Sequence, residues 1–306
     1  MSPERDGLKG IRELWQKRHP GVALFAAVLV GGAGVWCLRE KGGRPSSLER
    51  QLEEVAPVGG AVVTVPVDVD FEGQPGSAAW VWQILRGEAK DSTPEDREGV
   101  WAFLREGFGA ATQNLNWFAA DEALTWLRGA VAAASEIESG LMSLGGDRSL
   151  SESLRCFALQ HLGIWAEEHR LGAGVVAQLR AATGEVQSGG VGGAALRVLN
   201  RIRTSPAEEA WLRTRVVELL ENVDCSPEQR VAALQIAVEL DAVAVEPVAR
   251  KLVAPSRQVS ERVNAFFALG RLGNEETLRW LSSQAQPAEA LVLEAKERAI
   301  RNLATR

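Results

Sequence analysis

The sequence predicts an all-α protein: an α-solenoid of helix pairs, preceded by one transmembrane helix and an irregular linker. Three observations lead to this prediction. An uncharged apolar stretch lies near the N-terminus, apolar residues recur at helical spacing from about residue 78 onward, and an alanine returns every 32 to 38 residues. The predicted parts are a basic tail (1–20), the transmembrane helix (21–38), the linker (39–77) and the helical repeat domain (78–306).

The 306-residue chain has the composition of a folded protein, because 46% of its residues are hydrophobic and 24% are charged. Its net charge of −6 is unevenly distributed: residues 1–50 carry nine Lys and Arg against five Asp and Glu, a net of +4, which leaves −10 for the rest. An acidic body argues against nucleic acid as a partner, because binding phosphates requires clustered positive charge. Three cysteines are too few for a disulfide scaffold or a multi-cysteine zinc module.

The predicted membrane segment, residues 21–38, contains no charged residue and has basic residues on both sides. As a helix it would be about 27 Å long, close to the hydrocarbon thickness of about 30 Å. Trp15 and Trp36 lie near its two ends, where indoles favour the headgroup region. A cleaved signal peptide is the alternative, but the long preceding tail and the lack of a small-residue cleavage site favour a retained anchor. We therefore predict a single-pass protein of a bacterial inner membrane.

The orientation of this anchor rests on a small charge difference. Five Lys and Arg precede the span and four follow it, which favours a cytoplasmic N-terminus and an extracytoplasmic C-terminal domain. The opposite topology, with a cytoplasm-facing domain, is the alternative. Within the span, Ala23, Ala27 and Gly31 recur at four-residue steps and form a small-residue face that predicts weak homodimerisation. Chance spacing in a Gly- and Ala-rich segment explains the same pattern.

The linker is rich in Pro, Gly, Ser and Val. Residues 48–55 have the pattern of a short helix, and residues 62–69 alternate like a strand that has no partner to pair with. Asp68, Asp70 and Glu72 have the spacing of calcium-loop ligands, but the required glycine and closing glutamate are absent. We interpret this part of the chain as a tether.

From about residue 78 the pattern is helical, and Pro94, Pro206 and Pro227 each follow a Ser or Thr as expected at helix starts. A motif then repeats: a basic or small residue, an alanine three positions later, and an apolar residue four positions after that. The copies are Arg155-Ala158-Leu162, Gly192-Ala195-Leu199, Arg230-Ala233-Ala237, Arg262-Ala265-Leu269 and Lys296-Ala299-Leu303, with Ala123 and Leu127 as a degenerate earlier copy. Helix pairs of this period stack, because each buries its apolar face on its neighbours.

One copy also resembles a known family. Residues 260–281 are similar to the short HEAT-like repeat of phycobilisome lyases, through Arg262-Val263, Ala265, the Ala268-Leu269-Gly270 step, Leu272-Gly273, Leu278 and Leu281. Looser copies cover about residues 113–306, without the Leu-Gly turn and with longer connections. The resemblance implies an α-solenoid used for protein interaction. It leaves open a lyase-type enzyme or an enzyme-maturation factor as an alternative.

The residues able to support catalysis or bind a metal do not form a known pattern. His161 and His169 would lie about 12 Å apart along a helix, too far to share one zinc ion, and Cys156 would point in another direction than His161. Residues 190–195 fit a dinucleotide fingerprint but follow no apolar strand, so we interpret them as a flexible inter-repeat loop. We therefore predict no metal, no cofactor and no catalytic residues.

The predicted partner is another protein. In HEAT-like stacks the second helix of each pair lines the concave surface, and here residues 206–222, 245–253 and 274–284 are such helices. Near their middles they carry Arg213, Arg250 and Arg279, which would form a ladder of positive charge for an acidic partner. Trp280 adjoins the last of these cations, and Arg with Trp is a pair that interfaces favour. Ordinary solvated arginines and core tryptophans are the alternative.

Overall fold

A computed structural model describes residues 84–85, 89–107, 117–130, 132, 134–185 and 189–306. All of them belong to the compact unit formed by Asp70–Arg306, which is distinct from a unit formed by Met1–Val69. The predicted basic tail, transmembrane helix and linker lie outside the described residues, as do the short helix at 48–55 and the strand-like segment at 62–69.

The described part of the chain is all-α, with twelve α-helices, two short 3-10 helices and no strand, as the sequence predicts. The elements of its first half are η1 (Ala89–Asp91), α4 (Pro94–Gly107), α5 (Trp117–Gly129), α6 (Ala134–Gly146), α7 (Glu152–Trp165) and α8 (Ala173–Ala182). The second half contains α9 (Gly189–Ile202), α10 (Pro206–Glu221), α11 (Pro227–Glu239), η2 (Val243–Val245), α12 (Glu246–Leu252), α13 (Val259–Leu272), α14 (Glu275–Ser283) and α15 (Ala290–Ala304).

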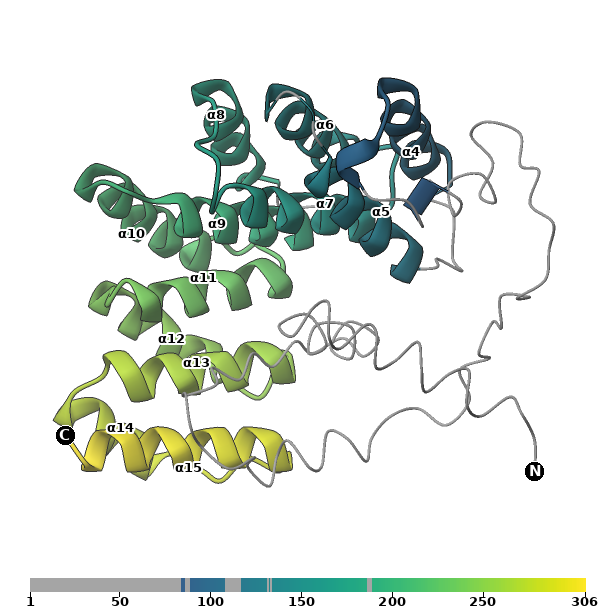
Figure 1. Ribbon diagram of the computed structural model, residues 1–306. Coiled ribbons are helices and arrows are strands. Elements are labelled where there is room, and N and C mark those ends of the chain that lie inside the picture. The colour runs from purple at the N-terminus through teal and green to yellow at the C-terminus, as the bar shows by residue number, and fades with distance from the viewer. Residues whose placement is uncertain (1–83, 86–88, 108–116, 131, 133, 186–188) are drawn as a thin grey trace, which may run out of the picture. The chain divides into compact units, whose positions relative to one another are not determined.

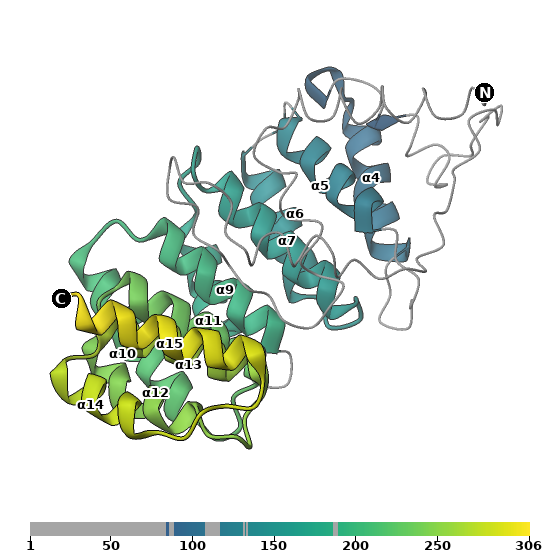
Figure 2. The ribbon, with the colours of Figure 1, turned by 90° about the horizontal axis from the view of Figure 1, so that it is seen from below.

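The helices form two layers. The helices that carry the repeated alanine, here called motif helices, pack one on the next in chain order: α5, α7, α9, α11, α13 and α15. Each is covered by the helix that precedes it, so α4, α6, α8, α10, α12 and α14 are the cover helices. Figure 1 shows α9, α11, α13 and α15 lying side by side, and Figure 2 gives the view from below. This is a helical-repeat fold compatible with a HEAT-like solenoid.

The repeated alanines lie at the contacts between motif helices, as predicted. Ala158, Ala195, Ala233 and Ala265 are fully buried, and Ala299 is 2% exposed. The spacing between α13 and α15 is especially close, since a Cβ atom at Gly270 would lie 2.7 Å from the Cα of Ala299. Small residues are needed here because the backbones of adjacent helices approach one another.

The predicted helix starts are confirmed at three prolines. Pro94, Pro206 and Pro227 each occupy the first position of their helix, α4, α10 and α11. The side chains of Ser205 and Ser226 accept hydrogen bonds from the backbone N–H groups of Glu208 and Gln229. These hydroxyls satisfy donors that have no partner within the helix, which is why the helices begin at these residues.

The basic residue that opens most copies of the motif binds the end of the preceding cover helix. Arg155 Nε donates to the carbonyl oxygen of Gly145 at 3.0 Å, at the end of α6. Arg230 Nη2 donates to the carbonyl of Val223 at 2.9 Å, just after α10, and Lys296 Nζ donates to the carbonyl of Gln284 at 2.6 Å, just after α14. Carbonyl groups at a helix C-terminus lack an intrahelical donor and carry partial negative charge. The buried cations supply both the donor and the opposite charge.

Two motif helices differ: in α13 the motif cation Arg262 pairs with Glu289 at 2.7 Å, and in α9 the motif begins with Gly192. The carbonyl at the end of α8 belongs to Thr183, and it accepts from Gln229 Nε2 at 2.7 Å and from Arg215 Nη2 at 3.0 Å. A Cβ atom at position 192 would lie 2.5 Å from Gln229 Nε2. Glycine therefore leaves the space through which the amide of the following motif helix reaches the carbonyl.

The interpretation of residues 190–195 as a loop is wrong, because these residues form the first turns of α9. Gly189 faces Ser226 and Gly193 faces Ala232, so the glycines let α9 approach α11 closely. Glycine has a low intrinsic helix propensity of about 1 kcal/mol relative to alanine. The packing of α9 between α7 and α11 stabilises the helix by more than its glycines destabilise it. The sequence pattern alone does not reveal this packing.

Candidate functional site

The three predicted ladder arginines lie on successive cover helices, α10, α12 and α14. Arg213 is held within the fold, since its Nε and Nη2 donate to the carbonyl of Leu240 at 3.0 and 2.7 Å and its Nη2 lies 2.8 Å from Glu209. Leu240 is the C-cap residue that follows α11. Arg213 therefore caps a helix, although about half of its side chain remains exposed.

Arg250 and Trp280 are brought together by the packing of α12 beside α14. The guanidinium carbon of Arg250 lies 5.2 Å from the centroid of the Trp280 ring, within the range of a cation–π interaction. Arg250 also pairs with Glu246 at 2.5 Å and with Glu276 at 3.3 Å. The cation over Trp280 is thus Arg250 rather than its neighbour in sequence.

Arg279 is exposed, as Arg213 is, whereas Arg250 is only partly exposed. Its Nε donates to the carbonyl of Glu275, one turn earlier in α14, at 3.4 Å. Trp280 itself is half-buried and packs against the core. The recognition pair that the sequence suggests at residues 279 and 280 stays a prediction, and the cation–π contact of Trp280 is formed with Arg250 from another helix.

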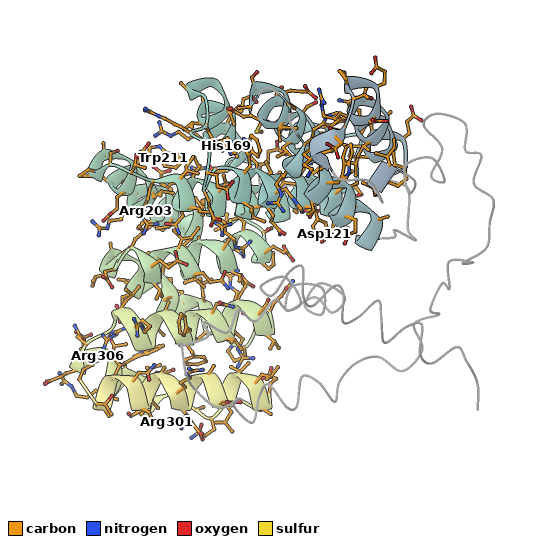
Figure 3. All side chains as sticks on the ribbon, viewed as in Figure 1. Asp121, His169, Arg203, Trp211, Arg301 and Arg306 are labelled. Carbon is orange, nitrogen blue, oxygen red and sulfur yellow. The ribbon has the colours of Figure 1, made fainter. Side chains whose placement is uncertain are left out.

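The sequence analysis missed a second pair of the same kind. The guanidinium carbon of Arg180, on α8, lies 5.0 Å from the centroid of the Trp211 ring, on α10 (Figure 3 labels Trp211). The two pairs recur at nearly equal spacing, because Arg180 and Arg250 are 70 residues apart and Trp211 and Trp280 are 69 apart. Self-comparison at twice the repeat length would have found this signal. We call Arg180–Trp211 and Arg250–Trp280 the Arg–Trp pairs.

The candidate residues for metal or nucleophilic chemistry are separated and used in packing. Burial raises the pKa of the Cys156 thiol to about 12, so the reactive thiolate form is suppressed. The ring of His169 stacks on Trp165 with 3.6 Å between ring centroids, and His161 lies between Asp121 and Arg128 (Figure 3 labels His169 and Asp121). Among the described residues, no group of three or more His, Cys, Asp or Glu side chains is placed to hold a metal ion.

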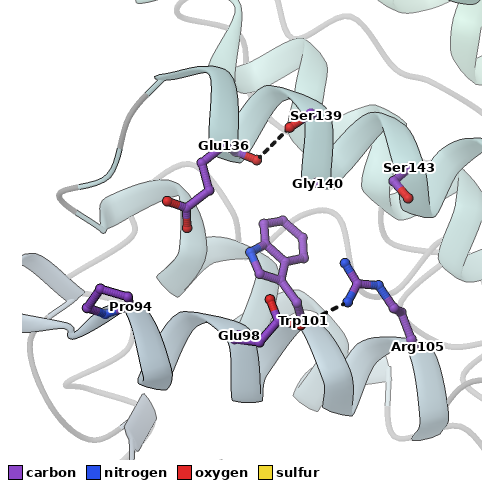
Figure 4. A pocket seen from close by; sticks show the side chains of 8 residues that line it. All are labelled: Pro94, Glu98, Trp101, Arg105, Glu136, Ser139, Gly140 and Ser143. Atoms are coloured by element: carbon purple, nitrogen blue, oxygen red, sulfur yellow. Dashed lines mark hydrogen bonds and ion pairs between the residues drawn. The ribbon is translucent and has the colours of Figure 1, made fainter.

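A pocket of about 550 Å³ lies between α4 and α6 (Figure 4). Its charged groups are occupied, since Arg105 pairs with Glu98 at 3.3 Å and Glu136 pairs with Arg97 at 2.8 Å. The indole of Trp101 packs against Gly140, where any side chain would collide with the ring. The pocket therefore presents exposed ion pairs and serine hydroxyls around a buried tryptophan, and these do not form a nucleophile–base pair.

The residues predicted to pack within the membrane, Ala23, Ala27 and Gly31, lie outside the described residues. Within the described ranges, every helix is too short or too polar to cross a bilayer. Comparisons of the chain with models of known protein families, with curated proteins and with solved structures give no match.

Proposed function

We propose that this chain is a non-catalytic scaffold or adaptor of the HEAT-like type, anchored in the membrane by residues 21–38, whose helical stack binds another protein. The proposal combines the sequence resemblance with the arrangement of the helices. Stacked helix pairs expose long side surfaces, and helical-repeat proteins use such surfaces for binding. The groups that could support catalysis have structural roles instead. Cys156 is buried, His161 joins two helices, and motif cations such as Arg230 bind carbonyl groups at helix ends, so none of them adds support for an enzyme.

The observation that carries the proposal is the recurrence of the Arg–Trp pairs on the cover helices. Protein interfaces are enriched in Arg and Trp, and these residues contribute a large share of binding energy where they are exposed together. Both tryptophans are half-buried, so each is held in place by the core and still contributes to the surface. Arg180, which lies over Trp211, and Arg279, which precedes Trp280 in the sequence, are exposed. They add positive charge in a domain that is acidic overall. An acidic segment of a partner protein fits this surface.

Crosslinking and affinity capture from a membrane extract test the binding surface. The variant Arg180→Glu with Arg279→Glu reverses the two exposed charges, and we expect it to reduce capture of the wild-type partner about tenfold or more. Arg298→Glu with Arg301→Glu, on the exposed face of α15, is the matched control for the same change of charge. Equal capture by wild type and the first variant would exclude this surface. A visible chromophore bound to the purified chain would instead favour the lyase-type alternative.

The ladder residues Arg213 and Arg250 are less suitable for charge reversal, because each forms hydrogen bonds and ion pairs within the domain. Reversal of all three ladder charges would remove the Arg213 contact with Leu240 and leave Glu246 and Glu276 facing a new acidic residue. We expect this triple variant to unfold at a lower temperature, whereas the Arg279→Glu change alone should leave the melting temperature unchanged. Loss of capture therefore identifies a binding residue only where the melting temperature is unchanged. We expect this condition to hold for the variants of Arg279 and Arg180.

The membrane part of the proposal places the C-terminal domain outside the cytoplasm and the N-terminus inside. Reporter fusions to the C-terminus, one active only in the cytoplasm and one active only outside it, distinguish this topology from its opposite. Weak self-association through Ala23, Ala27 and Gly31 is tested by Gly31→Ile in a membrane-dimerisation reporter assay, where a bulky residue should abolish the signal. Equal signals from wild type and variant would leave this helix as an anchor only.

A further inference from the structure

The imidazole of His161 connects α7 to α5 through both of its nitrogen atoms. Its side chain is 4% exposed. Arg128 Nε donates to His161 Nδ1 at 2.9 Å, and His161 Nε2 lies 3.0 Å from Asp121 Oδ1. A guanidinium has only donors, so Nδ1 must accept, and the proton of the neutral ring is therefore on Nε2, which donates to Asp121.

A second proton on the His161 ring would point toward the N–H donor of Arg128. It would bind at Nδ1, where the Arg128 N–H already points, and would place two positive charges side by side. The charged groups around this pair come from three elements: Asp121 and Arg128 on α5, Glu167 and Glu168 just after α7, and Arg201 on α9. Arg201 is itself paired with Glu167 at 2.7 Å. Asp121 is the acidic group in contact with the ring, and it binds the nitrogen that is already protonated.

The direction of the pH dependence follows from this environment. Burial lowers the pKa of His161, Arg128 lowers it further, and the hydrogen bond and charge of Asp121 only partly oppose these effects. The neutral ring is therefore the form that the folded contact favours. Its contribution to stability is complete above the ordinary histidine pKa of about 6.5 and is lost as the pH falls from there toward the lowered value.

We infer that Asp121, His161 and Arg128 form an acid-released latch, which fixes α5 on α7 at neutral pH and releases α5 in mild acid. In α15 the corresponding position, three residues after the repeated alanine, holds Asn302, which does not titrate; in α9, α11 and α13 it holds Val198, Ile236 and Ala268. These buried apolar residues do not titrate, so the response is confined to the α5–α7 contact. Release of α5 uncovers the surface of α7 that it packs against.

Hydrogen–deuterium exchange of the full-length chain tests the latch. Amide protection is measured for peptides from α5 and α13 at about pH 7.5 and about pH 5.5, on either side of the ordinary histidine pKa, and corrected for intrinsic exchange. Protection of α5 should fall up to about tenfold per pH unit below 6.5, while that of α13 should stay constant. A change in α5 no larger than that in α13 would overturn the inference.

Two variants remove the latch in different ways. His161→Gln cannot gain the proton, and in Arg128→Met the protonated ring meets no donor and can pair with Asp121 instead. In His161→Gln, α5 protection should no longer fall with acid. In Arg128→Met the fall should be smaller than in the wild type, because burial still lowers the pKa of His161 while the Arg128 charge no longer does. If His161→Gln proves unstable, Arg128→Met decides the matter. His169→Gln is the control, since this second histidine stacks on Trp165 and should leave the acid response intact. An acid response in Arg128→Met as large as that of the wild type would contradict the latch.

Discussion

The segments that follow α10 and α8, here called junctions, both contain carbonyl groups that accept hydrogen bonds from buried side chains, but the donor residues differ. After α10, the motif cation Arg230 binds the carbonyls of Asn222 and Val223 and pairs with Glu261 of α13 at 3.0 Å. After α8, the motif position holds Gly192, and the neutral amide of Gln229 reaches the carbonyl of Thr183 instead. What both junctions require is a buried donor at the end of the cover helix, and here α11 supplies both donors: Arg230 for the cover helix directly before it and Gln229 for the one before that.

The two junctions differ in what they bury. Arg230 and Glu261 expose 5% and 2% of their side chains, so their junction contains an ion pair removed from water. Breaking such a pair is costly because the remaining charge is left without a partner. The Gln229 side chain is fully buried but uncharged, and it also accepts a hydrogen bond from the Cys225 thiol. The charged junction should therefore be the more sensitive of the two to substitution.

The largest expected effect comes from cutting the chain within the junction after α10. Ending it at Asp224 removes α11, and with it both the Gln229 donor and the surface that covers α9. A repeat protein depends on neighbouring repeats to bury its core, so we expect the shortened chain to aggregate or remain unfolded. Circular dichroism and gel filtration of the soluble fraction measure this. A folded, monomeric product would mean that the α8–α9 junction is stable by itself.

Arg230→Met should lower the free energy of unfolding by about 3–5 kcal/mol, because it leaves the Glu261 carboxylate buried without its cation. Urea unfolding followed by circular dichroism gives the value. Arg301→Met is the control, since Arg301 is largely exposed and lies 3.8 Å from Glu297. Replacing the pair together, with Arg230→Met and Glu261→Leu, should recover much of the loss. No recovery would indicate that the helix-end carbonyls, rather than the ion pair, determine the stability of this junction.

Ala265→Leu tests the packing between motif helices, which both junctions depend on. Ala265 is fully buried, and the added atoms should cost about 1–3 kcal/mol through overpacking. A thermal melt compared with that of Ala304→Leu, at an exposed alanine of α15, measures the effect. An unchanged melting temperature would place residue 265 away from a close helix contact.

Gly192→Ala should have the smallest effect, because loss of one typical hydrogen bond costs about 1 kcal/mol and the higher helix propensity of alanine offsets part of that cost. The new Cβ would displace the Gln229 amide from Thr183, while Arg215 remains bonded to that carbonyl. Combined with Gln229→Ala, the two changes should cost less than the sum of the single effects, because they act on the same contact. Additive costs in this double-mutant cycle would show that the glycine does not serve the Gln229 contact.

The sequence by itself determined the fold class, the repeat and the helix starts. Alanines at a fixed period and prolines after Ser or Thr are local signals, and Ala233, Pro206 and Pro227 lie where those signals place them. Where a helix begins depends on residues within a few positions of its start, and which of its faces is buried depends on the spacing of its apolar residues. Such features can be recognised without knowing which helices meet.

Only the tertiary structure decided what the charged and aromatic residues do. Arg250 rather than Arg279 lies over Trp280, Arg213 caps α11, and the glycines of residues 190–195 belong to a helix. Each of these contacts joins residues that are about one repeat or more apart in the chain, or depends on how closely two helices approach. Periodicity defines the face of a helix but neither the register between helices nor the distance that separates them.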